Sequence, residues 1–190
     1  MQPLVAFQPI AVTINADHFS LFGLAPAFSL DLAQLDAAHK EVMARVHPDR
    51  FASGTAAERR VAMQWAARAN EAHRTLRDDG RRAAHLCELH GVAIDAETNT
   101  AMPSAFLMQQ MQWREALDEL PAQEPQRAAG IASLHAQVDS LRADVVARLS
   151  QALDQAHDFT AAAALVRQLM FIDRFRAELP VHHADTAHGD

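Results

Sequence analysis

The chain has 190 residues, of which 49% are hydrophobic and 22% charged, with only 6 glycines and 8 prolines. This composition is typical of a globular protein rich in helices and excludes a chain that is disordered throughout. Its single cysteine, Cys87, excludes an intramolecular disulfide and any zinc or iron–sulfur site that needs several cysteines of this chain.

The net charge of −7 is distributed unevenly along the sequence. Residues 17 to 90 contain 10 Lys+Arg and 10 Asp+Glu, which leaves 7 basic and 14 acidic residues for positions 91 to 190. A phosphate-binding surface needs a net basic face, so this distribution argues against nucleic acid as the main partner. It also supports two units with separate tasks.

The N-terminal segment, residues 1 to 16, contains no lysine or arginine. It therefore lacks both the charged start of a secretory signal and the arginines of a mitochondrial transit peptide. No apolar run approaches the length that spans a membrane. We expect a soluble, cytoplasmic protein that does not associate with membranes.

The first half of the chain predicts two antiparallel helices after a short helical segment at residues 17 to 23. The first helix begins at Ser29 or Asp31 and ends at or before His47, because Pro48 pushes the preceding residue out of the helical region. The second begins near Ser53 or Thr55 with a capping-box pattern, and its apolar spacing runs through Val61, Trp65, Ala69, Ala72 and Leu76. Residues 81 to 90, after the sequence DDG, predict a shorter helix closed by Gly91.

A polar interruption at residues 92 to 102 precedes three further predicted helices, at 103 to 120, about 127 to 156 and about 158 to 179. The middle one carries an apolar stripe that must be buried against neighbours, formed by Ile131, Leu134, Val138, Leu141, Val145, Leu149 and Leu153. Nothing in the sequence predicts a strand. We expect an all-α protein with an N-terminal extension (1–16), a first domain (17–91), a linker (92–102), a three-helix bundle (103–180) and a disordered tail (181–190).

Several sequence blocks resemble one known family. The segments DHFSLFGL, KEVMARVHPDRFASG and RANEAHRTLRDDGRRAAHLCELHG resemble a J domain of the HscB type, a co-chaperone of iron–sulfur cluster assembly. The segments AFLMQQMQWREALDEL and VRQLMFIDRF resemble the C-terminal bundle of that family, so the resemblance covers about residues 17 to 179. The tripeptide HPD alone is weak evidence for this family. It becomes strong evidence because it lies between two predicted amphipathic helices and the other blocks occur in order. The resemblance implies an L-shaped molecule of two helical domains.

The resemblance implies that the HPD loop binds a DnaK-class ATPase chaperone of the HscA kind and stimulates its ATP hydrolysis, so that this chain is not itself an enzyme. Asp49 would accept a charge-assisted hydrogen bond from an arginine of the chaperone, in a loop whose backbone is fixed by proline. The expected chaperone-binding residues are His47, Pro48, Asp49, Lys40, Arg45 and Arg50. The alternatives are an ordinary helix-stop turn for HPD and a solvated helix face for the three cations.

The helix predicted at 103 to 120 has apolar residues on more faces than one buried stripe needs. Phe106, Gln110, Trp113, Leu117 and Leu120 have core-like spacing. A further strip of Leu107, Met108 and Met111 is bordered by polar and charged residues, which is typical of a protein-docking surface. The resemblance implies that this surface binds IscU, the scaffold protein on which clusters are built, through Leu107, Met108, Met111, Gln112, Arg114, Glu115 and Phe171. The alternative is that the strip packs against the first domain.

The sequence departs from the family pattern at a few positions. Asp79 and Gly80 replace a common proline, His85 replaces a frequent aromatic residue, and Gln112 replaces a common acidic residue. Cys87 lies among small and apolar residues, which predicts a buried thiol. A cluster in the C-terminal tail predicts at most weak, adventitious metal binding, so we expect no resident metal or cofactor; it consists of His182, His183, Asp185 and His188.

The sequence thus predicts a bacterial co-chaperone that joins a chaperone-binding site to a scaffold-binding site. Such a link raises the local concentration of scaffold at the chaperone. Two alternatives stay open: a J-domain adaptor for a different client protein, and an enzyme that uses His47 and Asp49 as an acid–base pair. The enzyme is disfavoured because a proline is expected to splay the two side chains apart.

Overall fold

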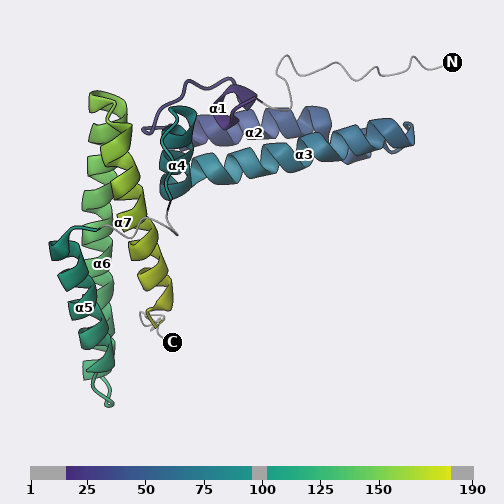
Figure 1. Ribbon diagram of the computed structural model, residues 1–190. Coiled ribbons are helices and arrows are strands. Elements are labelled where there is room, and N and C mark those ends of the chain that lie inside the picture. The colour runs from purple at the N-terminus through teal and green to yellow at the C-terminus, as the bar shows by residue number, and fades with distance from the viewer. Residues whose placement is uncertain (1–15, 96–101, 181–190) are drawn as a thin grey trace. The chain divides into compact units, whose positions relative to one another are not determined.

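The computed structural model describes residues 16–95 and 102–180, and every regular element in these ranges is helical (Figure 1). The all-α prediction is therefore confirmed. The chain divides into two compact units, Met1–Gly91 and Val92–Asp190, each with its own core. None of the helices in the described ranges has both the length and the hydrophobicity that crossing a membrane requires.

The first unit is built on two long antiparallel helices, α2 (Leu32–Val46) and α3 (Ala56–Arg77), which pack along each other (Figure 1). The Asp31 side chain caps α2 by accepting hydrogen bonds from the backbone N–H groups of residues 33 and 34. Thr55 and Glu58 form the predicted capping box at the start of α3. Between the two helices, Pro48–Phe51 forms a single 3₁₀ turn, η1.

The other two helices of this unit, α1 (His18–Leu21) and α4 (Asp79–Leu89), both pack on α3. Phe19 of α1 and Leu35, Ala69 and Leu76 of the long helices are completely buried. The start of α4 differs from the prediction, which placed a break at residues 78 to 80. The Asp78 side chain caps α4 by accepting a hydrogen bond from the Arg81 N–H, so the new helix begins directly at Asp79 and already contains Asp79 and Gly80 instead of following them.

The second unit consists of α5 (Ser104–Asp118), α6 (Gln126–Ser150) and α7 (Phe159–Glu178). Both α5 and α7 pack along α6 (Figure 1). Trp113 of α5 stacks on Phe175 of α7 with 5.4 Å between ring centroids. The predicted stripe of α6 forms the core, with Leu141 half-buried and the other members buried: Ile131, Leu134, Val138, Val145, Leu149 and Leu153.

The end of the middle helix also differs from the prediction. Residues Gln151–Ala156 form a wider, π-helical turn, η2, which follows α6. His157 then adopts a left-handed backbone conformation with φ of 52°, and the Asp158 N–H donates to the Ala152 carbonyl at 2.9 Å. The apolar spacing could not indicate this change because Leu153, inside the wider turn, is still buried.

Three parts of the sequence prediction fall outside the described residues, one of them residues 96–101 of the predicted linker. The N-terminal extension up to residue 15 and the predicted disordered tail, with its histidines, lie there. In residues 16–95 and 102–180, no group of three or more His, Cys, Asp or Glu side chains could hold a metal ion.

Candidate functional site

The tip of the α2–α3 hairpin carries the HPD sequence. Helix α2 ends at Val46, as predicted, and His47 has φ of −58° and ψ of 130°, which turns the chain out of the helix before the proline. The His47 Nδ1 accepts a long hydrogen bond, 3.4 Å, from the Asp49 N–H and thereby caps η1. Because Nδ1 accepts this bond, the neutral ring carries its proton on Nε2.

The side chains of His47 and Asp49 at the tip are exposed to solvent. The side chain of His47 is 50% exposed and that of Asp49 is 89% exposed. An Asp49 carboxylate oxygen lies 3.5 Å from His47 Nδ1, so the proline does not splay the two side chains apart as we expected. The carboxylate is thus open to a partner at the end of the α2–α3 hairpin.

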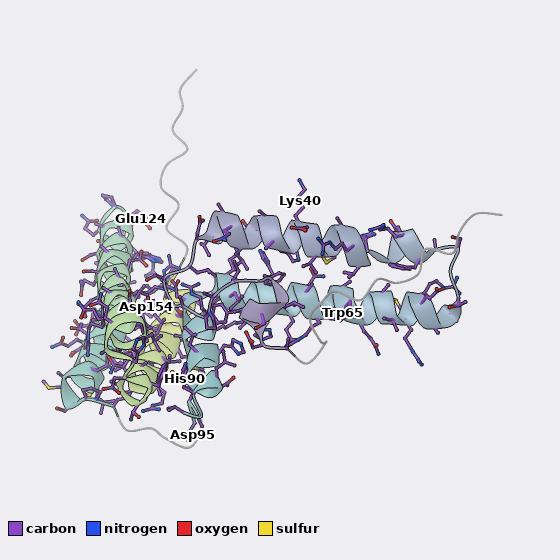
Figure 2. All side chains as sticks on the ribbon, turned by 90° about the horizontal axis from the view of Figure 1, so that it is seen from above. Lys40, Trp65, His90, Asp95, Glu124 and Asp154 are labelled. Atoms are coloured by element: carbon purple, nitrogen blue, oxygen red, sulfur yellow. The ribbon has the colours of Figure 1, made fainter. Side chains whose placement is uncertain are left out.

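Arg45 and Arg50 lie near this tip and Lys40 lies in the middle of α2 (Figure 2), and the three cations differ in what they contact. Lys40 is exposed and projects from α2 away from α3 (Figure 2). Arg45 forms an ion pair with Glu41 one turn earlier on the exposed face of α2. The Arg50 guanidinium donates to the Ala44 carbonyl at 2.8 Å and so joins η1 to the last turn of α2.

A second candidate site lies on the second unit, where three apolar side chains of α5 are exposed. Leu107 is 45% exposed, Met108 61% and Met111 70%, whereas Phe106 and Trp113 of the same helix are buried. The prediction that α5 has a second apolar face outside the core is confirmed. These three side chains are called the α5 strip below.

Polar and aromatic groups border the α5 strip. Gln112, Arg114 and Glu115 are exposed. The Arg114 guanidinium lies 3.7 Å from the Glu178 carboxylate of α7 and 5.9 Å from the ring centroid of Phe175. Because exposed ion pairs are weak, Arg114 is available to a partner.

Helix α7 contributes the predicted aromatic residue, Phe171. It also carries an exposed methionine, Met170, which the sequence prediction did not include. Phe171 is half-buried and packs edge to face on Phe106 of α5, with 5.8 Å between ring centroids. Met170 is 49% exposed and precedes Phe171 directly. The sequence signal that could have indicated Met170 was a methionine directly before an aromatic residue, in the segment LMFIDRF.

The departures from the family pattern have local explanations in the first unit. The His85 ring stacks on Phe19 at 5.9 Å and lies 4.3 Å from the His18 ring, so it fills the place of an aromatic residue. Asp79 forms an ion pair with the buried Arg82 at 2.8 Å. Cys87 is completely buried, as predicted, and this burial raises the pKa of its thiol to about 11.

A helical hairpin with an HPD tip, followed in the same chain by a bundle of α5, α6 and α7, defines the class of J-domain co-chaperones. The family model described as the HSCB C-terminal oligomerisation domain matches residues 102–180. The chain is 52% identical over 163 residues to the co-chaperone protein HscB homolog of Bordetella pertussis. The aligned region covers 86% of this chain and 94% of that protein.

Solved structures agree with this assignment. The chaperone HscB from Vibrio cholerae matches with a TM-score of 0.75 and 34% identity, over 86% of this chain and 95% of that one. Human co-chaperone protein HscB matches with a TM-score of 0.80 and 25% identity, over 87% and 81% of the two chains. The chain therefore belongs to the HscB co-chaperone family. Members of this family are not enzymes, and membership implies a partner of the Hsp70 chaperone class.

Proposed function

We propose that this protein stimulates ATP hydrolysis by a specialised HscA-type chaperone and delivers the iron–sulfur scaffold IscU to it. The observation that carries the chaperone half of the proposal is the Asp49 carboxylate, 89% exposed at the end of a helical hairpin. A carboxylate in this position is suited to a charge-assisted hydrogen bond with an arginine of the chaperone. The chaperone performs the hydrolysis, and this chain shifts its conformational equilibrium.

The proposed chaperone-binding site comprises the HPD tripeptide and three cations, of which Arg45 and Arg50 lie near it and Lys40 lies further back on α2. Pro48 restricts the backbone, and His47 accepts a hydrogen bond from the Asp49 N–H while its half-exposed side chain stays accessible to the partner. Lys40, Arg45 and Arg50 add a basic rim, in which each exposed contact contributes about 1 kcal/mol or less. The rim mainly favours the encounter with an acidic chaperone surface.

The scaffold-binding site comprises the α5 strip with Gln112, Arg114, Glu115 and Phe171. Exposed methionine and leucine side chains adapt to the shape of a partner and supply apolar area, while the polar rim gives orientation. The half-buried Phe171 adds an aromatic anchor beside the strip. We propose IscU as the occupant because of the resemblance of these segments to the HscB family.

The proposed roles divide the chain as the sequence suggests: residues 17–91 act on the chaperone, 103–180 bind the scaffold, and 92–102 link them. Joining two sites in one chain makes the second binding event intramolecular, so modest separate affinities suffice. We place this activity in the bacterial cytoplasm, where clusters are assembled on the scaffold.

Two measurements test the proposal. Steady-state ATP hydrolysis by an HscA-type chaperone should rise when the protein is added and should not rise with Asp49→Asn, which keeps the shape and removes the charge. Calorimetric titration of apo IscU into the protein should give saturable binding. An active wild-type protein that does not bind IscU would instead identify a J-domain adaptor for another client.

A further inference from the structure

Long side chains connect the HPD loop to both helices of the hairpin. On one side, the Arg50 guanidinium of η1 donates to the Ala44 carbonyl of α2 at 2.8 Å. On the other side, the Arg59 guanidinium of α3 donates to the Ala52 carbonyl, directly after η1, at 3.2 Å. Each bond joins the loop to a helix that is itself packed into the core of the unit.

The backbone of the loop also forms hydrogen bonds of its own, among them the one from the Arg50 N–H to the His47 carbonyl at 3.1 Å. The Ala52 N–H donates to the Asp49 carbonyl at 3.3 Å, and the Gly54 N–H donates to the Phe51 carbonyl at 2.9 Å. Phe51 is 7% exposed and anchors the middle of this stretch in the core. The Arg59 contact falls at Ala52, which is exposed and lies between the buried Phe51 and the cap of α3.

We infer that Arg59 is a positioning residue of the chaperone-binding loop. Its guanidinium fixes the Ala52 carbonyl and thereby the end of η1, the single turn that presents Asp49. A loop that is already ordered loses less conformational entropy when the chaperone binds. This inference rests on the proposed function of the loop, and it assigns a role to a residue outside the HPD sequence and outside the basic rim.

The next residue along α3 provides a matched control. Arg60 is also exposed and carries the same charge, and its side chain forms no hydrogen bond or ion pair with the described part of the chain. Arginine and glutamine have similar helix propensities, so Arg59→Gln and Arg60→Gln preserve α3 equally. A surface-charge effect would appear in both variants, whereas a positioning effect would appear only in Arg59→Gln.

The first readout uses the free protein, without chaperone. Backbone ¹⁵N relaxation should show lower order parameters at the Ala52 and Gly54 amides in Arg59→Gln than in wild type, with no change in Arg60→Gln. Order parameters unchanged in Arg59→Gln would overturn the inference. This readout does not depend on whether the chaperone assignment is right.

The second readout is the concentration of protein that gives half-maximal stimulation of an HscA-type chaperone. Arg59→Gln should raise it about threefold to tenfold, as expected for the loss of one hydrogen bond, and Arg60→Gln less than about twofold. The difference should persist at high salt because the contact is intramolecular. Equal effects of both variants, lost at high salt, would make Arg59 a charge contact. If wild type fails to stimulate, the proposed function fails, while the order parameters still decide whether Arg59 orders the loop.

Discussion

Phe106 of α5 and Phe171 of α7 meet edge to face, with their ring centroids 5.8 Å apart. Phe106 is buried and Phe171 half-buried, so this contact ties the helix that bears the α5 strip to the helix that bears the aromatic anchor. Edge-to-face pairs add about 0.5–1.5 kcal/mol beyond their buried area. The two parts of the proposed scaffold-binding surface are therefore held at a fixed separation before any partner binds.

Met111→Ala should weaken scaffold binding without weakening the fold. The side chain is 70% exposed, so its removal leaves no cavity and should change the free energy of unfolding by less than about 0.5 kcal/mol. At the centre of an interface, the same truncation should cost about 1–2 kcal/mol, or about fivefold to thirtyfold in the dissociation constant. Calorimetric titration with apo IscU measures this change.

Met63→Ala is the matched control for this prediction. Met63 is 55% exposed on α3, in the other unit and outside both proposed sites. Its truncation should change neither stability nor affinity for the scaffold. Equal losses of affinity in the two variants, or no loss in Met111→Ala, would show that the α5 strip is not part of the binding surface.

Arg82→Met should destabilise the first unit strongly. Arg82 is 5% exposed and donates to the Phe28 and Leu76 carbonyls at 2.8 and 2.6 Å. Methionine fills similar space but leaves both carbonyls without this donor, which should cost about 2–5 kcal/mol in urea unfolding. The exposed neighbour offers a control, since Arg81→Met should cost less than about 0.5 kcal/mol. Similar losses in both variants would contradict the structural role of Arg82.

The helix boundaries of the first unit show what local sequence chemistry could and could not predict. The end of α2 before Pro48 and the capping box of α3 were predicted because the residues concerned act on their immediate neighbours. The start of α4 was not, since Asp78 in a DDG sequence serves equally well as a turn former or as a helix cap. The packing of α4 on α3 decides between these roles, and a local sequence pattern carries no information about that packing.

Stability of the first unit should fall as the pH decreases from about 7 to about 5. Burial, assisted by the positive charges of His85 and Arg68, lowers the pKa of His18 to about 4. An unfolded histidine titrates near 6.5, so over this range the unfolded chain binds a proton that the folded chain excludes. The expected loss is about 1–2 kcal/mol in urea unfolding at about pH 5 relative to about pH 7.

His18→Gln measures the share of His18 in this pH dependence, because burial also lowers the pKa of the neighbouring His85. The variant should have a flatter stability profile between the two pH values, whatever its absolute stability. Carboxylates with a lowered pKa, such as Asp17, lose their contribution only below about pH 4, outside this window. A profile as steep as that of wild type would show that His18 does not titrate in the way its burial implies.

Cys87 should be protected from thiol reagents in the native protein. It is completely buried, and burial raises the pKa of its thiol to about 11, so the reactive thiolate is scarce at neutral pH. Reaction with an aromatic disulfide reagent should be at least about 100-fold slower in buffer than in denaturant. Arg82→Met should react faster than wild type, because it populates open states more often. An immediate native reaction would contradict the packing of α4.

The two candidate sites were also predictable to different degrees. The α5 strip could be predicted because Leu107, Met108 and Met111 are surplus to one buried face, and all three are exposed. The contact of Arg59 with the Ala52 carbonyl has no sequence signal, since an exposed arginine in the first turns of a helix is ordinary. Such a contact forms only because the folded loop brings the Ala52 carbonyl within reach of the Arg59 guanidinium.

The central claim is that one chain couples a chaperone-stimulating loop to a scaffold-binding surface, and steady-state ATP hydrolysis by an HscA-type chaperone tests it most directly. The rate should be measured with the protein alone, with IscU alone and with both. We predict that both together stimulate more than the sum of the separate effects. His47→Gln should abolish the stimulation by this protein, and Met111→Ala should reduce only the synergy. A rate that wild-type protein leaves unchanged, with or without IscU, would contradict the account.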